Sequence, residues 1–352
     1  MGTMRALRKT SRGRGAGIED IPVPEPGEGE VLVRVHAASI CGTDLHIYEW
    51  NEWADKRIPR VPMTFGHEVA GWVEAVGPEV HHVQPGAFVA AETHIACGIC
   101  STCRTGRAHI CRNLRILGVD TDGAFAGYVV VPAQNAWVVG EGIHPDHASV
   151  MEPFGNAVHA TFGTEGGEDL PTNPVAVIGC GPIGLFSVAI ARALGAWKVF
   201  AIEPVAERRA LAGKMGADLL IDPAAEDPVE VVTRETDGNG AEVVLEMSGN
   251  ARAIDQGTRM LARGGRMSLL GLPEGPVTLD LNDQVIFKEA KILGITGREM
   301  FRTWQQTTTL LSTGRVDVSP VITHRFPLER FEEAFETAAS GHAAKVIMFP
   351  GS

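Results

Sequence analysis

The stretch SICGTDLHIYEW, residues 39–50, gathers four side chains that can do chemistry. Cys41, Thr43, Asp44 and His46 follow the apolar run VLVRVHAAS, which predicts a buried strand over residues 31–39. A fold does not require a thiol, a hydroxyl, a carboxyl and an imidazole at a strand end. The stretch is therefore either a polar turn or part of an active site. Helix N-capping is the role expected for Asp44.

A second cluster, CGICSTCRTGRAHIC, holds Cys97, Cys100, Cys103 and Cys111. Short C-x-x-C steps let successive thiolates reach one tetrahedral ion, and four thiolates leave no coordination position for a substrate. The spacing therefore predicts a structural zinc. An iron–sulfur cluster and two disulfides are the alternatives, and disulfides are disfavoured in a chain expected to be cytoplasmic.

Residues far apart in the sequence suggest a second metal site. Cys41 is left over from the cysteine cluster, His67 and Glu68 stand side by side in TFGHEVAG, and Glu152 lies in MEPFGNAVH. Each alone is a weak signal, since a lone His or Glu is more often a surface or core residue. Together they supply one Cys, one His and one or two carboxylates, a set that suits a catalytic zinc with an open position.

The segment GCGPIG places Gly179, Gly181 and Gly184 in the pattern G-x-G-x-x-G, between an apolar run and an apolar helix. In that context the pattern predicts a dinucleotide site, because the glycines allow a tight turn, close approach of the pyrophosphate and close helix packing. A strand–helix turn without a ligand is the alternative.

The next apolar run ends in Glu203, where an acidic residue accepts hydrogen bonds from the adenosine ribose and repels a 2′-phosphate. Arg208 and Arg209 follow, and a nearby Arg can instead accommodate that phosphate. With a carboxylate at the strand end, we expect NAD+ and read the two arginines as solvated helix residues.

The helices and strands that must position these residues follow two different sequence patterns. Up to about residue 155, short Val-rich runs separated by turn residues predict a mostly β domain. From about 174 to 297, six apolar runs alternate with helices, which predicts an α/β fold with a doubly wound, parallel, six-stranded sheet. The elements expected there are a strand, a glycine turn, a helix and a strand within 174–204, a helix over 205–216, strands over 217–222 and 241–249, a helix over 251–262, and strands over 264–272 and 290–296.

The segment after Gly297 is too short for a domain, and we expect it to pack back onto the first part. The expected division is a catalytic domain over 1–157 with the structural zinc loop, an NAD-binding domain over 158–297, and a return segment over 298–352. The uncharged run 170–191 is interrupted by prolines and glycines, so it predicts a strand, a turn and a helix and not a membrane span.

Composition excludes some classes of function. The 352 residues carry a net charge of −12 without a basic run, which argues against a nucleic-acid partner. The N-terminal residues are basic but no apolar segment follows them, so no signal peptide is predicted and a cytoplasmic protein is expected.

In order and spacing, CGTD, GHE, the four-cysteine loop and GCGPIG resemble the zinc-dependent medium-chain dehydrogenase family over essentially the whole chain. The resemblance implies a Rossmann domain beside a GroES-like catalytic domain, NAD+, one catalytic and one structural Zn2+ per chain, and a homotetramer. Longer segments, among them EPFGNAVHA and IFKEAKILGITGREMFRTW, are similar to members that oxidise L-threonine to 2-amino-3-oxobutyrate.

The resemblance also implies roles for single residues. Cys41, His67 and Glu68 are expected to bind the catalytic zinc. Thr43 and His46 are expected to relay the proton. Two more residues are expected near the substrate: Glu152, which approaches or binds the zinc, and His94, which shapes the pocket. The positions expected to contact NAD+ are Gly179, Gly181, Ile183, Gly184, Glu203, Arg208, Leu270, Gly271, Leu272, Ile295 and Thr296.

Two alternative functions stay open. A zinc-dependent polyol dehydrogenase acting on sorbitol or 2,3-butanediol would share the fold and both zinc sites, although the segments EPFGNAVH and GREMF favour L-threonine. A zinc-stabilised NAD-binding protein without turnover would be expected to lack Cys41, His67 or the relay pair, and all are present. For the substrate's charged groups, Glu152 could face the ammonium and Arg298 the carboxylate; a salt bridge with Glu299 is the other reading of Arg298.

Overall fold

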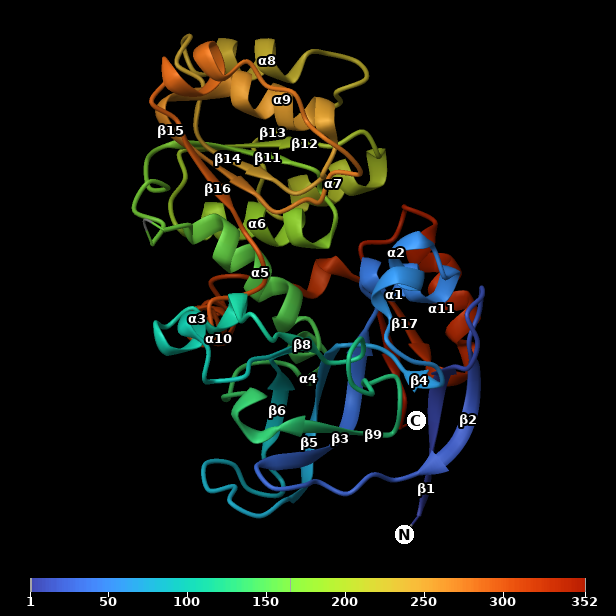
Figure 1. Cartoon of the computed structure of the whole chain (residues 1–352). Helices are drawn as coiled ribbons and strands as arrows, with labels where there is room; N and C mark the ends of the chain where they lie inside the picture. The colour runs from blue at the N-terminus through green and yellow to red at the C-terminus, as the bar shows by residue number, and fades with distance from the viewer. Residues whose placement is uncertain (1, 165, 352) are drawn as a thin grey trace. The chain divides into compact units, whose positions relative to one another are not determined.

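A computed structural model describes residues 2–164 and 166–351, and the chain divides into two compact units (Figure 1). Unit 1 consists of Met1–Pro153, Glu299–Ser312 and Ile322–Ser352. Unit 2 consists of Phe154–Arg298 and Thr313–Val321.

Unit 2 is built on a parallel sheet that has six strands within residues 166–351, in the order β13-β12-β11-β14-β15-β16. The strand order reverses between β11 and β14, which is the doubly wound pattern, with its switch point at the carboxyl ends of these two strands. The predicted fold class and sheet are therefore confirmed. The strands are β11 (Pro174–Ile178), β12 (Lys198–Ile202), β13 (Leu219–Ile221), β14 (Ala241–Glu246), β15 (Leu261–Leu269) and β16 (Lys291–Gly294).

Helices cover both faces of this sheet (Figure 1). One face carries α6 (Pro182–Ala193) and α7 (Ala206–Lys214), and the other carries α8 (Pro228–Glu235) and α9 (Ala251–Met260). Because both faces are covered, the central strands are continuously apolar. The helix α8 has no counterpart among the expected elements, although a Pro at the first helical position after a capping Asp is a helix-start signal.

The uncharged run 170–191 folds as β11, a turn and most of α6, as predicted. Across the two described ranges, every helix is too short or too polar to cross a bilayer.

Unit 1 is mostly β. Its main sheet has the order β10-β6-β5-β3-β18-β17, with β9 also paired to β3, and a smaller sheet has the order β2-β1-β4. The strands of the main sheet are β3 (Glu30–Ser39), β5 (Glu68–Val76), β6 (Phe88–Ala91), β9 (Tyr128–Pro132), β10 (Ala136–Val138), β17 (Ile322–Pro327) and β18 (Lys345–Phe349). The other strands are β1 (Thr3–Lys9), β2 (Gly17–Pro22), β4 (Met63–Thr64), β7 (His94–Ile95) and β8 (Arg115–Ile116).

The helices of unit 1 include two that directly follow β3. They are α1 (Gly42–Glu49) and α2 (Glu52–Arg57), so Thr43, Asp44 and His46 all lie on a helix. The remaining helices are α3 (Ser101–Arg104), α4 (Pro145–Ala148), α10 (Arg302–Ser312) and α11 (Phe331–Ala339), together with α5 (Met151–Phe162), which begins in unit 1.

The last strand, β18, is central to this sheet because it lies between β3 and β17. Its Ile347 is opposite Ser39 of β3, and Ser39 is opposite Glu68 of β5. Apolar side chains of these strands form the core, among them Val33, Val69 and Val346. The end of β3, the start of β5 and the start of β18 therefore meet at one place.

Candidate metal centres and dinucleotide site

Three residues from that place form a possible metal site. Cys41 follows β3 and caps α1, while His67 and Glu68 stand at the start of β5. Their ligand atoms, one from each residue, lie within 4.8 Å of one another. The structure therefore brings together residues that the sequence separates by more than twenty positions.

The chemistry of these donors fits a cation. Oε1 of Glu68 is buried and has no hydrogen-bond partner among the described residues. Burial alone would lower the pKa of His67, but the charges of Asp44 and Cys41 outweigh it and raise that pKa well above its usual range. The raised pKa of His67 shows that negative charge is concentrated around its ring. The same negative charge also favours the binding of a divalent ion such as Zn2+.

Asp44 orients two of the three donors. Its Oδ2 accepts a hydrogen bond from the backbone N–H of Cys41 at 2.8 Å, which closes a capping box at the start of α1. Its Oδ1 lies 3.4 Å from Nδ1 of His67, which is an ion-pair distance, although neither atom has a hydrogen-bond partner among the described residues. Asp44 therefore takes part in the helix cap from position N3, whereas the N-cap residue itself is Cys41, and the contact with His67 is additional.

The predicted relay residues share α1. Thr43 is half-buried in the first turn, and His46 is exposed one turn later, at a spacing that puts both on one side of a helix. Nδ2 of Asn51 lies 2.7 Å from Nδ1 of His46. Because Oδ1 of Asn51 accepts from the N–H of Ala54, its NH2 group must face the ring, so Nδ1 of His46 accepts and the neutral ring carries its proton on Nε2.

Glu152 and His94 lie outside the group of ligand atoms described above. Glu152 is buried in the first turn of α5, and its charge helps to raise the pKa of Lys345. His94 begins β7, where its backbone N–H donates to Oε1 of Glu92 at 2.7 Å, while Trp304 donates to Oε2 of the same carboxylate at 2.6 Å.

Arg298 is buried in unit 2 and donates to Oδ1 of Asn156 at 3.2 Å. Glu299, the alternative partner considered above, forms an ion pair with Arg302 at 3.4 Å.

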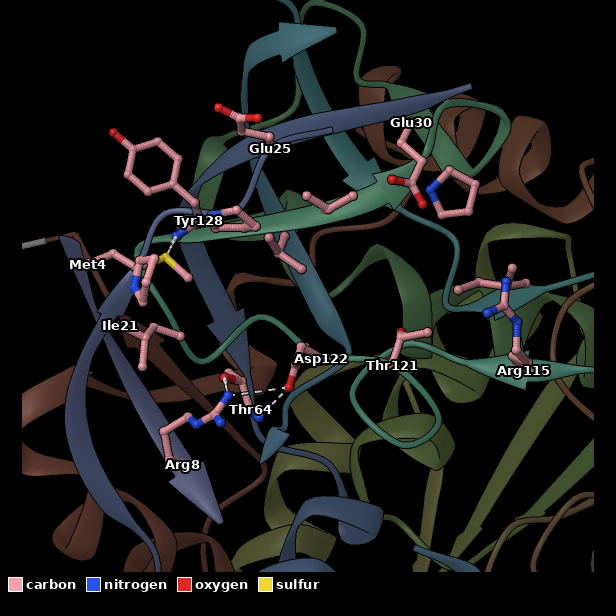
Figure 2. A pocket seen from close by; sticks show the side chains of 17 residues that line it. Met4, Arg8, Ile21, Glu25, Glu30, Thr64, Arg115, Thr121, Asp122 and Tyr128 are labelled. Atoms are coloured by element: carbon pink, nitrogen blue, oxygen red, sulfur yellow. Dashed lines mark hydrogen bonds and ion pairs between the residues drawn. The ribbon is translucent and has the colours of Figure 1, made fainter. Parts of the chain in front are cut away.

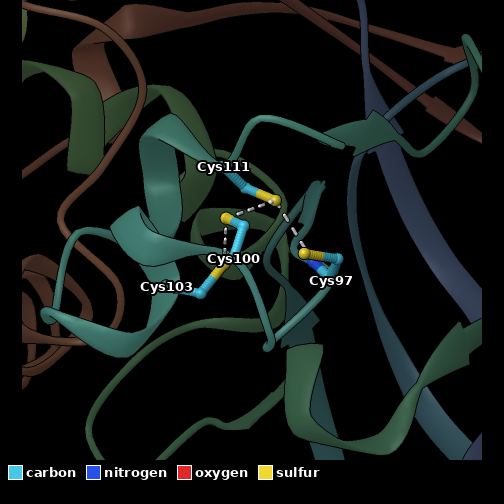
Figure 3. Close-up of side chains that lie close together, drawn as sticks. All are labelled: Cys97, Cys100, Cys103 and Cys111. Atoms are coloured by element: carbon cyan, nitrogen blue, oxygen red, sulfur yellow. Dashed lines mark hydrogen bonds between the residues drawn. The ribbon is translucent and has the colours of Figure 1, made fainter.

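The four-cysteine loop gathers as the spacing predicted (Figure 3). Sγ of Cys100 lies 3.4 Å from Sγ of Cys103 and 3.8 Å from Sγ of Cys111. Four sulfurs at about 2.3 Å from one zinc would be about 3.8 Å apart, so the cluster fits a tetrahedral ion. Hydrogen bonds, first from the Thr102 hydroxyl, lower the pKa of Cys100 to about 5 and favour a thiolate. All six cysteines are free thiols, which disfavours the disulfide alternative.

The glycine motif borders a cavity of about 580 Å³ in unit 2. A Cβ on Gly184 would lie 1.9 Å from the carbonyl oxygen of Gly179, so the helix can pack this closely only with glycine there. At Gly181, by contrast, a Cβ would meet no atom within 4 Å. The predicted residues that line the cavity are Gly179, Gly181, Glu203 and Arg208; lining residues that the sequence analysis missed include Met247, Ser248, Asn250 and Arg252.

Backbone N–H groups hold the Glu203 carboxylate in place at the end of β12. Oε2 accepts from Cys180 at 2.7 Å and Oε1 from Val205 at 2.9 Å. Arg209 donates to the carbonyl oxygen of Glu203 and forms an ion pair with Asp222, so only Arg208 of the two arginines lines the cavity.

The other predicted cofactor positions follow the carboxyl ends of neighbouring strands or open α6. Ile183 is in the first turn of α6, Leu270, Gly271 and Leu272 follow β15, and Ile295 and Thr296 follow β16. None of them lines the 580 Å³ cavity. The N–H groups of Leu270 and Gly271 donate to the carbonyl oxygen of Glu246, the last residue of β14. Parallel strands thus present these loops at one edge of the sheet.

A further cavity of about 500 Å³ in unit 1 contains none of the predicted site residues (Figure 2). Arg8 and Asp122 point toward one another there, and Arg8 also donates to Thr64. Among the described residues, neither group of clustered metal-ligating side chains lies in this cavity.

The comparisons with known proteins agree with this geometry. Residues 27–141 match the alcohol dehydrogenase GroES-like domain, and residues 182–313 match the zinc-binding dehydrogenase family. A curated L-threonine 3-dehydrogenase from Bacillus subtilis strain 168 is 51% identical, with 99% of each chain covered.

Two solved structures are similar in fold. One is a putative zinc-binding dehydrogenase from Sinorhizobium meliloti 1021 bound to NADP, with a TM-score of 0.90 and 31% identity over 99% of this chain and 100% of the other. The other is 2R,3R-butanediol dehydrogenase from Bacillus subtilis, with a TM-score of 0.89 and 25% identity over 99% of each chain. From its sequence motifs, its fold and these matches, the chain belongs to the zinc-dependent medium-chain dehydrogenase family.

Proposed function

We propose that the protein oxidises the side-chain hydroxyl of L-threonine with NAD+ and forms 2-amino-3-oxobutyrate, NADH and a proton. The half-buried Cys41 and the buried His67 and Glu68 carry this proposal, because together they offer a thiol, an imidazole and a carboxylate to one ion. The chain is also 51% identical to an L-threonine 3-dehydrogenase. The butanediol dehydrogenase is only 25% identical, which makes the polyol alternative weaker.

We assign Cys41, His67 and Glu68 as ligands of the catalytic zinc, and the four clustered cysteines as ligands of a structural zinc. A zinc ion held by the first set supplies Lewis-acid chemistry, which makes a bound hydroxyl more acidic. Glu152 is proposed to support this site and His94 to shape the substrate pocket.

The proton is proposed to leave along α1. Thr43 takes the proton of the substrate hydroxyl on its own hydroxyl oxygen while it releases its own hydroxyl proton toward His46, and His46 takes up that proton and in turn releases one to water. The exposure of His46 supports this exit. Each of these steps is a general acid–base transfer by a positioned side chain.

The cofactor is proposed to be NAD+, held by the glycine motif and the loops after β12, β15 and β16. The N–H groups at the start of α6 suit the pyrophosphate. The buried carboxylate of Glu203 suits the adenosine ribose and disfavours a 2′-phosphate, although Arg208 lines the same cavity. Hydride acceptance is chemistry of the cofactor itself.

The domain roles form part of the same proposal. Residues 1–157 and 298–352 are proposed as the catalytic domain and 158–297 as the NAD-binding domain. The pairing of β18 with β3, and of β17 with β18, supports the return of the last segment. A cytoplasmic location is proposed because the six cysteines are free thiols.

We also propose a homotetramer. The edge strand β16 has one free side, and the segment before it exposes the apolar side chains of Leu281, Ile286 and Phe287. Light scattering coupled to size-exclusion chromatography measures the mass of the assembly directly. Phe287→Glu should lower that mass.

The substrate is tested by following NADH absorbance with L-threonine, sorbitol and 2,3-butanediol, with NAD+ and NADP+ in parallel. Highest activity with L-threonine and NAD+ is expected. A preference for either polyol would contradict the substrate assignment, and no reduction with any of them would favour a binding protein without turnover.

The relay is tested with a matched pair of variants. Thr43→Val removes the hydroxyl at nearly constant shape and should lower turnover about 10²- to 10⁴-fold, the usual contribution of general acid–base catalysis. Thr43→Ser keeps the hydroxyl and should retain most activity. His46→Ala should reduce turnover strongly while NAD+ binding stays near normal; unchanged turnover would exclude His46 from the relay.

A further inference from the structure

Lys345 contacts the carboxylate of Glu68 from the far end of the sequence. Its Nζ lies 2.5 Å from Oε2 of Glu68, and both side chains are buried. Ser39 donates a hydrogen bond to the same oxygen. One carboxylate oxygen is therefore occupied twice, while the other, Oε1, is buried and has no hydrogen-bond partner among the described residues.

Lys345 is itself held in place. Its Nζ donates to the carbonyl oxygen of Ile40 at 2.9 Å, next to Cys41 in the sequence. The N–H of Ile40 donates in turn to the carbonyl oxygen of Val346, so β18 is bonded to the end of β3 at this point. The ammonium group of Lys345 is therefore fixed by the backbone, and a rotation of the Glu68 side chain would break its contact with Oε2.

We propose that Lys345 and Ser39 are positioning residues for the catalytic metal: they occupy Oε2 of Glu68, so that only Oε1 is presented to the ion beside Cys41 and His67. The inference rests on the proposed assignment of Glu68 as a ligand. A buried carboxylate oxygen without a partner costs folding free energy. The observed orientation of Glu68 is therefore favourable only if Lys345 and Ser39 hold Oε2 and a cation binds Oε1.

A consequence for charge follows. The thiolate of Cys41 and the carboxylate of Glu68 bring two negative charges to the ion, and the buried ammonium of Lys345 offsets one of them. Residues behind metal ligands that orient them and tune their charge commonly change metal affinity 10- to 100-fold when they are altered.

The test uses the full-length enzyme with zinc kept on the four cysteines and Co2+ added to the Cys41 site. The visible spectrum of Co2+ reports the number and geometry of its ligands without any turnover. Lys345→Met and Ser39→Ala should change that spectrum and weaken Co2+ binding about 10- to 100-fold. Lys345→Arg, which keeps a cation able to donate to Oε2, should restore part of both.

Lys9→Met is the matched control. Lys9 is also a fully buried lysine of unit 1, but among the described residues its Nζ donates to the backbone carbonyl oxygens of Gly13, Gly15 and Tyr48 and not to a carboxylate. Its loss should leave the Co2+ spectrum unchanged. If Lys345→Met does not fold, Ser39→Ala and Lys345→Arg decide the question.

Folded Lys345 and Ser39 variants with the wild-type spectrum, and with Co2+ affinity within about twofold of wild type, would overturn the positioning role while leaving the proposed function intact. Failure of the unaltered protein to bind Co2+ at Cys41 would overturn both the ligand assignment and the inference that rests on it.

Discussion

The buried arginine of unit 2 allows a stability prediction worked from its contacts. All five N–H donors of Arg266 are used. Two bonds go to Asp169, at 2.5 and 2.9 Å, and the others go to the carbonyl oxygens of Ala160 and Thr161 and the hydroxyl of Ser268. Arg266 therefore joins the end of α5 to β15, the strand that leads into Leu270–Leu272.

Arg266→Met removes the charge at nearly constant length. It leaves Asp169 without its buried partner and removes the guanidinium donor from the carbonyl oxygen of Thr161, while the carbonyl oxygen of Ala160 still accepts from the hydroxyl of Ser268. Breaking a buried pair from one side typically costs about 3–5 kcal/mol. With a urea slope of about 3 kcal/mol per M, the unfolding midpoint should fall by about 1 M or more. Urea denaturation at fixed protein concentration measures this, since assembly also shifts the midpoint.

Arg330→Met supplies the comparison. Arg330 makes the same two-bond contact with the carboxylate of Glu333, but both side chains are more than half exposed. Water screens that pair, so its loss should leave the midpoint almost unchanged. Equal shifts for the two variants, or no shift for Arg266→Met, would refute the reasoning that burial decides the strength of these pairs.

Three further predictions follow from single contacts. Gly184→Ala places a methyl group 1.9 Å from the carbonyl oxygen of Gly179 and should abolish NADH binding, measured by the fluorescence of the bound cofactor; retained binding would exclude the close helix approach. Cys103→Ser should lower zinc from two ions per chain to one by atomic absorption, with loss of thermal stability; unchanged zinc content would argue against the four-sulfur site. Burial alone would raise the pKa of Asp120, but hydrogen bonds from Arg57 lower it below its usual value. The stability that this pair contributes should therefore be present above about pH 4 and be lost as the pH falls further. Denaturation midpoints at pH 7 and pH 3 should therefore differ less in Arg57→Met than in the unaltered chain.

The sequence by itself determined the two sites whose geometry depends on a short segment of chain, namely the four-cysteine cluster and the glycine motif. The cysteine spacing and the glycine motif each need only a short segment of backbone, so their geometry follows from neighbours in the chain. The same holds for the parallel sheet, because long apolar runs alternating with helices admit few arrangements.

Only the tertiary structure decided what completes the metal centre. Lys345 has no motif around it, and it reaches Glu68 because β18 returns between β17 and β3. Asp44 was assigned as a cap from its position near a helix start, but its contact with His67 depends on where β5 begins relative to α1. Pairings between distant strands are set by the packing of the whole sheet, and no local pattern in the sequence specifies which buried charge will face which.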